Sequence, residues 1–218
     1  MDLSVAEFAR RSGISRQRAL AMVNAGQIEA KRVGRSWVIN QRETARRAAH
    51  GRPLSRRMAS IIISLIAGGS LDELNAQDRY LASRYLARLR DESEPASLLH
   101  SWMGSRQNKV IDVGANPVDL PEVARDKRVV PSGISDSRAG LSAQRELEGY
   151  ISAQNVDSFV RDNLLVPSDS PNVRLHVVDD LPSRPAPLGL VLADLADWNR
   201  PREDGRVREL LRSVTWSE

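Results

Sequence analysis

Four consecutive side chains near the start of the chain, Ser15-Arg16-Gln17-Arg18, can all hydrogen-bond to a base edge or to a phosphate. In the major groove of DNA, arginine pairs with guanine and glutamine pairs with adenine. Ser15 is also a good helix N-cap, so Arg16, Gln17 and Arg18 would form the first turn of a helix. The N-terminal residues of such a recognition helix are the ones that contact base edges.

Two short helices joined by a glycine turn are needed to present that first turn to DNA. Ser4 and Glu7 have the spacing of a capping box and predict a helix that ends at Ser12-Gly13. A second helix follows Ser15 and stops at Asn24-Ala25-Gly26. The side chains expected on its inner face are Ala19, Leu20, Met22 and Val23.

After Gly26 the pattern changes from helical to alternating, and Gly34-Arg35 divides the alternating stretch in two. This pattern predicts a β-hairpin with a tight turn, followed by a third helix over residues 42–50. The hairpin would form a basic wing whose contacts are mainly to phosphates, and these position a protein rather than specify a sequence. The wing residues expected to touch DNA are Lys31, Arg32, Arg35 and Ser36.

Trp37 and the segment His50-Gly51-Arg52-Pro53 each allow two interpretations. Trp37 could stack on a base, but its alternation with hydrophobic neighbours favours a core position beneath the hairpin. Residues 50–53 partly match an Arg-Gly-Arg-Pro arm that enters the minor groove, although the first arginine is replaced by His50. A linker is the favoured interpretation, and Arg52 is kept as a candidate DNA contact.

The charge is divided unevenly along the chain. Residues 1–57 contain 13 Lys and Arg against 4 Asp and Glu, whereas the remaining residues contain 19 against 24. The basic segment 1–57 is therefore expected to bind a polyanion, whereas the acidic remainder of the chain is not. The competing interpretation is a solvated basic face on a small interaction domain; the clustering of charge where DNA would dock favours DNA.

The composition describes an ordinary globular protein of 218 residues with 41% hydrophobic and 28% charged residues. No apolar run reaches the roughly 18 residues that span a bilayer, and no secretory signal is recognisable. The absence of cysteine excludes disulfides and thiolate zinc sites, so we expect a cytoplasmic protein.

The rest of the chain predicts an α+β protein in three parts: a winged helix-turn-helix at 1–51, a helical connector at 52–104 and a mixed α/β partner-binding domain at 105–218. Helices are expected near 56–67, 75–90, 95–102, 119–126, 156–165, 187–197 and 201–214. Strands are expected near 110–113, 128–130, 146–151 and 172–178, with a polar loop at 131–140.

Candidate catalytic residues are sparse in residues 58–218. His100 and His176 have no partner at metal-ligand spacing, and we interpret both as structural. Asp112, Glu146 and Glu148 could form a carboxylate cluster for a metal-dependent nuclease, but their spacing fits no metal motif. We therefore expect no catalytic residue, no metal and no cofactor, with the nuclease kept as a minor alternative.

The run LSVAEFARRSGISRQRALAMVNAGQIEAKRVGRSWVI resembles the MerR-like and excisionase family of winged helix-turn-helix domains. The resemblance covers about residues 2–50. It implies that Arg16, Gln17 and Arg18 enter the major groove of double-stranded DNA, and that Arg32, Arg35 and Ser36 contact the backbone from the wing. It fits both a repressor, which could bind DNA as a homodimer, and a phage-type excisionase.

A second resemblance, to the C-terminal region of AbiEi-type antitoxins of actinobacterial type, is carried by the runs SGISDSRAGLSAQRELEGYI, NVRLHVV, PLGLVLADLAD and PREDGRVRELL. That resemblance covers about residues 105–214, whereas the front module has a MerR-like wing in place of the usual one. It implies an autorepressor and antitoxin that counters a nucleotidyltransferase-like toxin. The alternative is an excisionase or architectural DNA-binding factor without a toxin partner.

Overall fold

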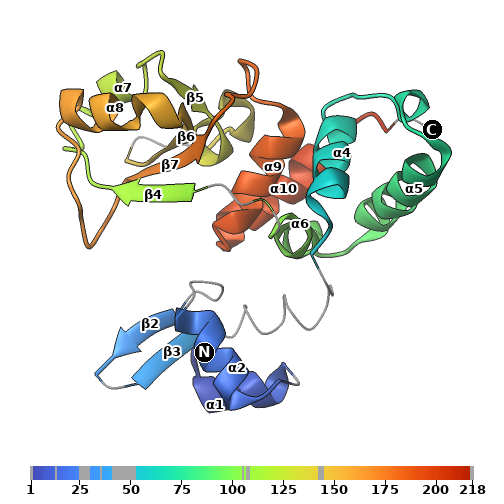
Figure 1. Cartoon of the computed structure of the whole chain (residues 1–218), viewed down its shortest axis with the longest axis horizontal. Helices are drawn as coiled ribbons and strands as arrows, with labels where there is room; N and C mark the ends of the chain where they lie inside the picture. Colours follow the sequence, from blue (N-terminus) through green and yellow to red (C-terminus); the bar gives the residue numbers. More distant parts are fainter. Residues whose placement is uncertain are drawn as a thin grey trace. The chain divides into compact units, whose positions relative to one another are not determined.

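The computed structural model describes residues 2–12, 14–24, 30–34, 36–40, 53–104, 106, 109–141 and 145–216. The chain divides into two compact units, Met1–Pro53 (unit 1) and Leu54–Glu218 (unit 2), drawn in Figure 1. Helices predominate over strands, as expected for the α+β class predicted from the sequence. The expected helix at 42–50 lies outside the described residues.

Unit 1 combines two helices with a small antiparallel sheet. Its elements are β1 (Asp2–Ser4), α1 (Val5–Arg11), α2 (Arg16–Asn24), β2 (Ala30–Val33) and β3 (Ser36–Asn40). The capping box forms as predicted, because the Ser4 hydroxyl accepts from the Glu7 backbone and the Glu7 carboxylate accepts from the Ser4 backbone. The sequence did not predict β1, which pairs with β3 and makes β3 the central strand.

A small hydrophobic core holds unit 1 together. Phe8 of α1, Ala19 of α2 and Ile39 of β3 are fully buried and belong to one cluster. Trp37 is half-buried and packs against this cluster, as the alternation predicted. Leu20 was expected in this core but is 40% exposed, because on α2 the inward face is set by Ala19 and Val23.

Unit 2 is built around a four-stranded sheet with the order β4-β7-β6-β5. Its strands are β4 (Lys109–Val113), β5 (Val129–Pro131), β6 (Leu147–Ser152) and β7 (Val173–Val178). β6 and β7 run parallel, and the two edge strands run antiparallel to their neighbours. The helices are α4 (Arg56–Ile66), α5 (Ala76–Asp91), α6 (Pro95–Met103), α7 (Leu120–Val123), α8 (Val156–Asp162), α9 (Leu188–Asp197) and α10 (Pro201–Arg212).

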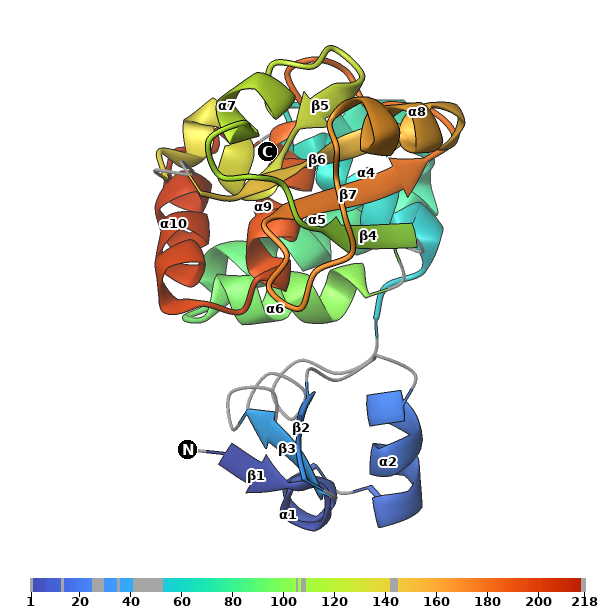
Figure 2. The same cartoon turned by 90° about the vertical axis from the view of Figure 1, so that its left-hand side faces the viewer.

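Helices cover both faces of this sheet, as Figure 2 shows. One face carries Val173 and Leu175 and packs against α7 and α8 through Val123 and Phe159. The opposite face carries Tyr150 and packs in a larger core with α4, α5, α6, α9 and α10. The second face also carries a row of polar side chains, because Asp112, Arg174 and Glu148 are cross-strand neighbours.

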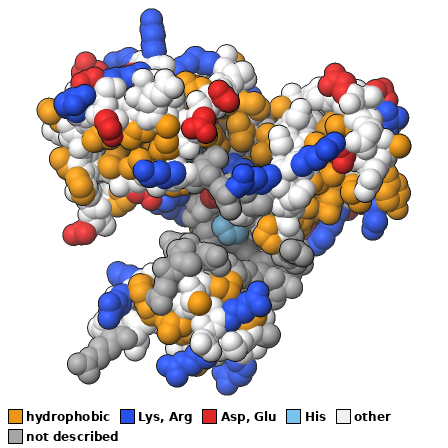
Figure 3. All heavy atoms as spheres, viewed as in Figure 1, with side chains coloured by type: hydrophobic (Ala, Val, Ile, Leu, Met, Phe, Trp, Pro, Cys, Tyr) orange, Lys and Arg blue, Asp and Glu red, His pale blue; other side chains and the backbone are white. Residues whose placement is uncertain are grey.

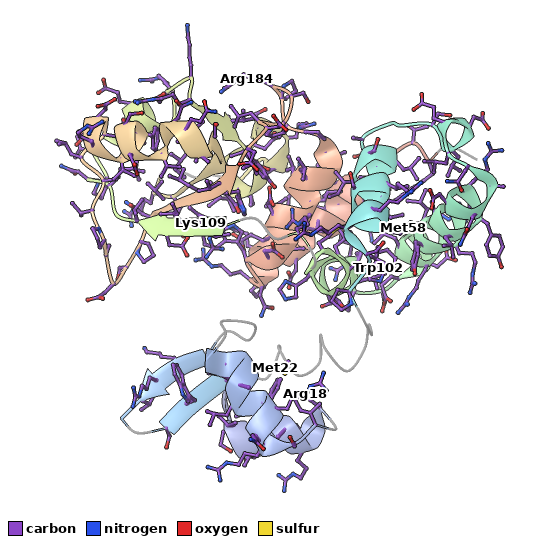
Figure 4. The ribbon with its side chains drawn as sticks, viewed as in Figure 1. Arg18, Met22, Met58, Trp102, Lys109 and Arg184 are labelled. Carbon is purple, nitrogen blue, oxygen red and sulfur yellow. The ribbon has the colours of Figure 1, made fainter. Side chains whose placement is uncertain are left out.

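The helices that we expected to form a separate connector at 52–104 belong to unit 2. Ile62 of α4, Leu98 of α6 and Leu192 of α9 are each fully buried in the same core. Figure 4 shows Met58 and Trp102 within this helical part, and both side chains are buried in that core. Because α4 and α6 bury their hydrophobic faces against α9, these helices complete the domain.

The loop expected at 131–140 is largely structured. It contains two 3-10 turns, Gly133–Ser135 and Ser137–Ala139, and buries Ile134 and Ala139 completely. Its serines made the segment look solvent-exposed, but Ser132 and Ser135 hydrogen-bond to side chain or backbone groups inside the domain.

Among the described helices, none is both long and apolar enough to cross a membrane.

Candidate nucleic-acid interface

The first turn of α2 presents polar side chains to solvent, as the sequence predicted. The Ser15 hydroxyl accepts a hydrogen bond from the Arg18 backbone at 3.2 Å and so caps the helix. The Ser15 side chain, also a candidate DNA contact, is therefore used as the N-cap of α2. Arg16, Gln17 and Arg18 are all exposed, and Figure 4 shows Arg18 beside Met22 on α2.

Leu20 extends the exposed face of α2 and was missed as a candidate contact. It lies three and four residues after Gln17 and Arg16, on the same side of the helix. An exposed leucine beside the two candidate contacts could meet the methyl group of thymine if this face of α2 lies in the major groove. Ala19 and Val23, which are both buried, are four residues apart and so share one face of the helix. That spacing is the sequence signal that could have placed Leu20 outside the hydrophobic core.

The hairpin carries the other basic candidates on its exposed residues. β2 and β3 pair with Val33 opposite Ser36 and Arg32 opposite Trp37. Gly34 has a φ of +60°, a left-handed conformation that glycine adopts freely and that the tight turn requires. Lys31, Arg32 and Ser36 are exposed, and the Arg32 guanidinium lies 6.0 Å from the Trp37 ring. The candidates Arg35 and Arg52 lie outside the described residues.

The described basic candidates of unit 1 have no ion-pair partner among the described residues. Within its described residues, no carboxylate lies within ion-pair distance of Arg16, Arg18, Lys31 or Arg32. Glu7 is engaged at the start of α1, where hydrogen bonds from the Ser4 backbone and hydroxyl lower its pKa. Exposed arginines on a helix N-terminus and on a hairpin produce a positive surface suited to a polyanion.

Unit 2 contains a second polar cluster, which is buried between its sheet and α9. Glu148 of β6 is fully buried and accepts from the His176 ring at 3.0 Å, from the Trp198 indole at 2.7 Å and from the Ile134 backbone at 3.1 Å. Gly133 makes this possible, because a Cβ there would lie 1.7 Å from a Glu148 carboxylate oxygen.

Arg106 forms the other half of the buried cluster. Its guanidinium donates to Asp194 at 2.8 Å and to Asp197 at 2.7 Å, both on α9. Asp194 also accepts from the Tyr150 hydroxyl at 3.0 Å and from the Ser132 hydroxyl at 2.5 Å. These bonds tie α9 to β6 and to the segment that precedes β4.

The surroundings of Glu148 and His176 favour the protonated form of each group. Burial raises the pKa of Glu148. For His176, burial lowers the pKa, but the Asp194 charge and the Glu148 hydrogen bond outweigh burial and raise it. Burial also raises the pKa of Tyr150, so its phenol stays protonated and donates to Asp194. The pair therefore stays protonated at a pH where a free imidazole is neutral.

The carboxylates considered for a nuclease are separately engaged. Asp112 pairs with Arg174 at 2.9 Å, Glu146 pairs with Arg200 at 3.0 Å, and Glu148 is sealed inside the domain. Among the described residues, no group of three or more potential metal ligands gathers in one place. His100 pairs with Asp197, whereas His176 pairs with Glu148 and also lies 3.9 Å from Asp194.

Comparison with known proteins gives one informative likeness. The chain is 29% identical over 143 residues to a probable plasmid-partitioning protein ParA of Thermus thermophilus, which covers 65% of this chain and 41% of that protein. The chain thus matches less than half of that relative's length. Because unit 1 has only 53 residues, more than half of the matched length falls in unit 2. No family model and no solved structure matches the chain.

Proposed function

We propose that the chain is a sequence-specific DNA-binding regulator that reads duplex DNA with unit 1. The observation that carries the proposal is the first turn of α2, where Arg16, Gln17 and Arg18 are exposed beside an exposed Leu20. In this role Arg16, Gln17 and Arg18 contact base edges. Lys31, Arg32 and Ser36 contact phosphates. The resemblance to MerR-like and excisionase domains supports the same assignment.

The finer role is that of an antitoxin and autorepressor with a nucleotidyltransferase-like toxin as its partner. This part rests on the resemblance of residues 105–214 to AbiEi-type antitoxins. In this proposal unit 2 needs no catalytic group, no metal and no cofactor, and acts by binding a protein. The protein would act in the cytoplasm, where its DNA and its toxin are found.

The test uses a mobility shift with the DNA upstream of the chain's own gene. Arg16→Ala or Arg18→Ala is expected to weaken specific binding by about 1–3 kcal/mol if the side chain contacts a base. Lys31→Ala or Arg32→Ala should weaken binding to every sequence and lower the salt slope by about 0.9 for each phosphate that is no longer neutralised. Arg125→Ala, an exposed arginine of unit 2, is the matched control. Unchanged binding in all four front variants would rule out DNA reading by unit 1.

A second candidate role is in DNA segregation, favoured by the likeness to a plasmid-partitioning protein. The two roles differ in what the neighbouring gene product does. Co-expression with a nucleotidyltransferase-like neighbour should restore growth and co-purify the two proteins if the chain is an antitoxin. A chain that acts in segregation should instead change the retention of a plasmid that carries its binding site. An integrase neighbour, with neither effect, would point to an excisionase.

A further inference from the structure

We propose that unit 2 carries a DNA-backbone contact of its own, a stripe of three side chains on α5: Tyr80, Arg84 and Arg88. This inference rests on the proposed function, because unit 1 brings the chain to duplex DNA. The three residues follow one another at four-residue intervals, so they lie along one side of the helix. With a rise of about 1.5 Å per residue, neighbouring members of the stripe are about 6 Å apart.

All three side chains are exposed, and aromatic rings position the two arginines. Tyr80 is 62% exposed, which is unusual for an aromatic residue in a unit with so large a core. The Arg84 guanidinium lies 5.7 Å from the Tyr80 ring, and the Arg88 guanidinium lies 5.8 Å from the ring of buried Trp102. A guanidinium held over a ring keeps its N–H donors directed outward, at little cost in side-chain entropy when it binds.

The stripe differs from the other arginines of this helical region in lacking a carboxylate. Arg57 pairs with Asp78, Arg90 lies 3.6 Å from Asp91 and Arg208 pairs with Glu94. In the described part of the chain, no carboxylate lies within ion-pair distance of Arg84 or Arg88. Figure 3 shows several Lys and Arg side chains on the part of unit 2 that contains α5, with Asp and Glu side chains and hydrophobic surface among them.

The chemistry of the stripe fits phosphates better than it fits a protein surface. Arginine and tyrosine both hydrogen-bond to phosphate oxygens in protein–DNA complexes. A protein partner would need an apolar centre to the contact, and Tyr80 is the sole exposed large hydrophobic side chain among the residues of α5. A second contact on the same duplex raises the affinity of the whole chain through effective concentration, without any sequence reading.

The test measures how the affinity of the full chain for duplex DNA depends on salt. Fluorescence anisotropy with a labelled duplex that lacks the chain's own upstream sequence is followed between about 50 and 200 mM salt. Arg84→Gln combined with Arg88→Gln should reduce the slope of log affinity against log salt by about 1.8, which is 0.9 for each of two phosphates. Arg84→Lys combined with Arg88→Lys keeps both charges and should keep the slope.

Arg90→Gln is the control for charge removal, because it removes one positive charge from the same helix outside the stripe. Equal slopes for the glutamine pair and Arg90→Gln would overturn the proposal, and so would a lysine pair that behaves like the glutamine pair. The outcome for unit 1 is separate. If Arg16→Ala and Arg18→Ala lose specific binding while the α5 variants keep their slope, this inference fails and the proposed function stands. If only the α5 variants change binding, DNA reading by unit 1 fails and the contact made by α5 stands.

Discussion

The raised pKa values of Glu148 and His176 predict that unit 2 loses stability as the pH rises above 6.5. The folded-state pKa of His176 lies above its ordinary value of 6.5, because the Asp194 and Glu148 carboxylates outweigh the effect of burial. A raised histidine pKa contributes stability that is complete below pH 6.5 and is lost as the pH rises through the folded-state pKa. The raised pKa of Glu148 acts in the same direction.

One proton bound by the folded state alone changes the free energy of unfolding by up to about 1.4 kcal/mol per pH unit. We expect a slope approaching that value above pH 6.5, levelling off once the folded pair has lost its proton. Urea unfolding followed by tryptophan fluorescence measures it. A Trp37→Phe background leaves only tryptophans of unit 2, including buried Trp102, as reporters.

Two substitutions separate this pair from other titrating groups. His176→Gln should reduce the slope above pH 6.5, because it removes the histidine contribution and leaves that of buried Glu148. His100→Gln should retain it, because His100 is 31% exposed and faces Asp197 rather than Glu148. A flat stability profile in the parent protein would refute the role of this pair, and a slope that His176→Gln leaves unchanged would assign it to another group.

Two further predictions concern packing and acid stability. Gly189→Ala should destabilise unit 2 by about 1–3 kcal/mol, since a Cβ there would lie 2.2 Å from the Ile63 carbonyl oxygen of α4. Gly205→Ala on α10 meets nothing within 4 Å and should stabilise by about 0.5–1 kcal/mol, so thermal unfolding of both variants checks the argument with its control. Asp126 has its pKa lowered to about 2, chiefly by hydrogen bonds from Arg128, so it contributes stability above pH 3.8 that is lost as the pH falls towards 2. Asp126→Asn should therefore reduce the steepness of acid unfolding between these pH values, and an unchanged acid profile would contradict the ion pair's role.

The sequence predicted most helices and strands because their signals are local. Ser4 caps its helix as its position suggested, Ser55 and Asn75 cap the helices expected near 56–67 and 75–90, and the alternating run NVRLHVV became β7. β1 was missed because three residues carry too little periodicity to be distinguished from a helix start. The exposure of Leu20 depends on which face of α2 meets Phe8 and Ile39, and that is decided by packing between elements.

The buried cluster could not be predicted because its members are far apart in the sequence. Arg106 and Asp194 are separated by 88 positions, and Glu148 and His176 by 28. Nothing local distinguishes a buried histidine on a strand from an exposed one. The order of the strands, in which β7 lies between β4 and β6, brings these residues together. For the same reason, the merging of α4–α6 into unit 2 is visible only in the tertiary packing.

The ion pairs of Arg106 also fix the longitudinal position of α9. This helix is apolar on nearly every side, and its buried residues include Leu192, Leu195 and Ala196. If α9 shifted along its axis by one turn, about 5.4 Å, its apolar side chains would still contact hydrophobic neighbours. That shift would take Asp194 away from Arg106, Tyr150 and Ser132 together, leaving a buried charge unpaired. The polar cluster thus selects one register of the helix from several that hydrophobic packing alone would accept.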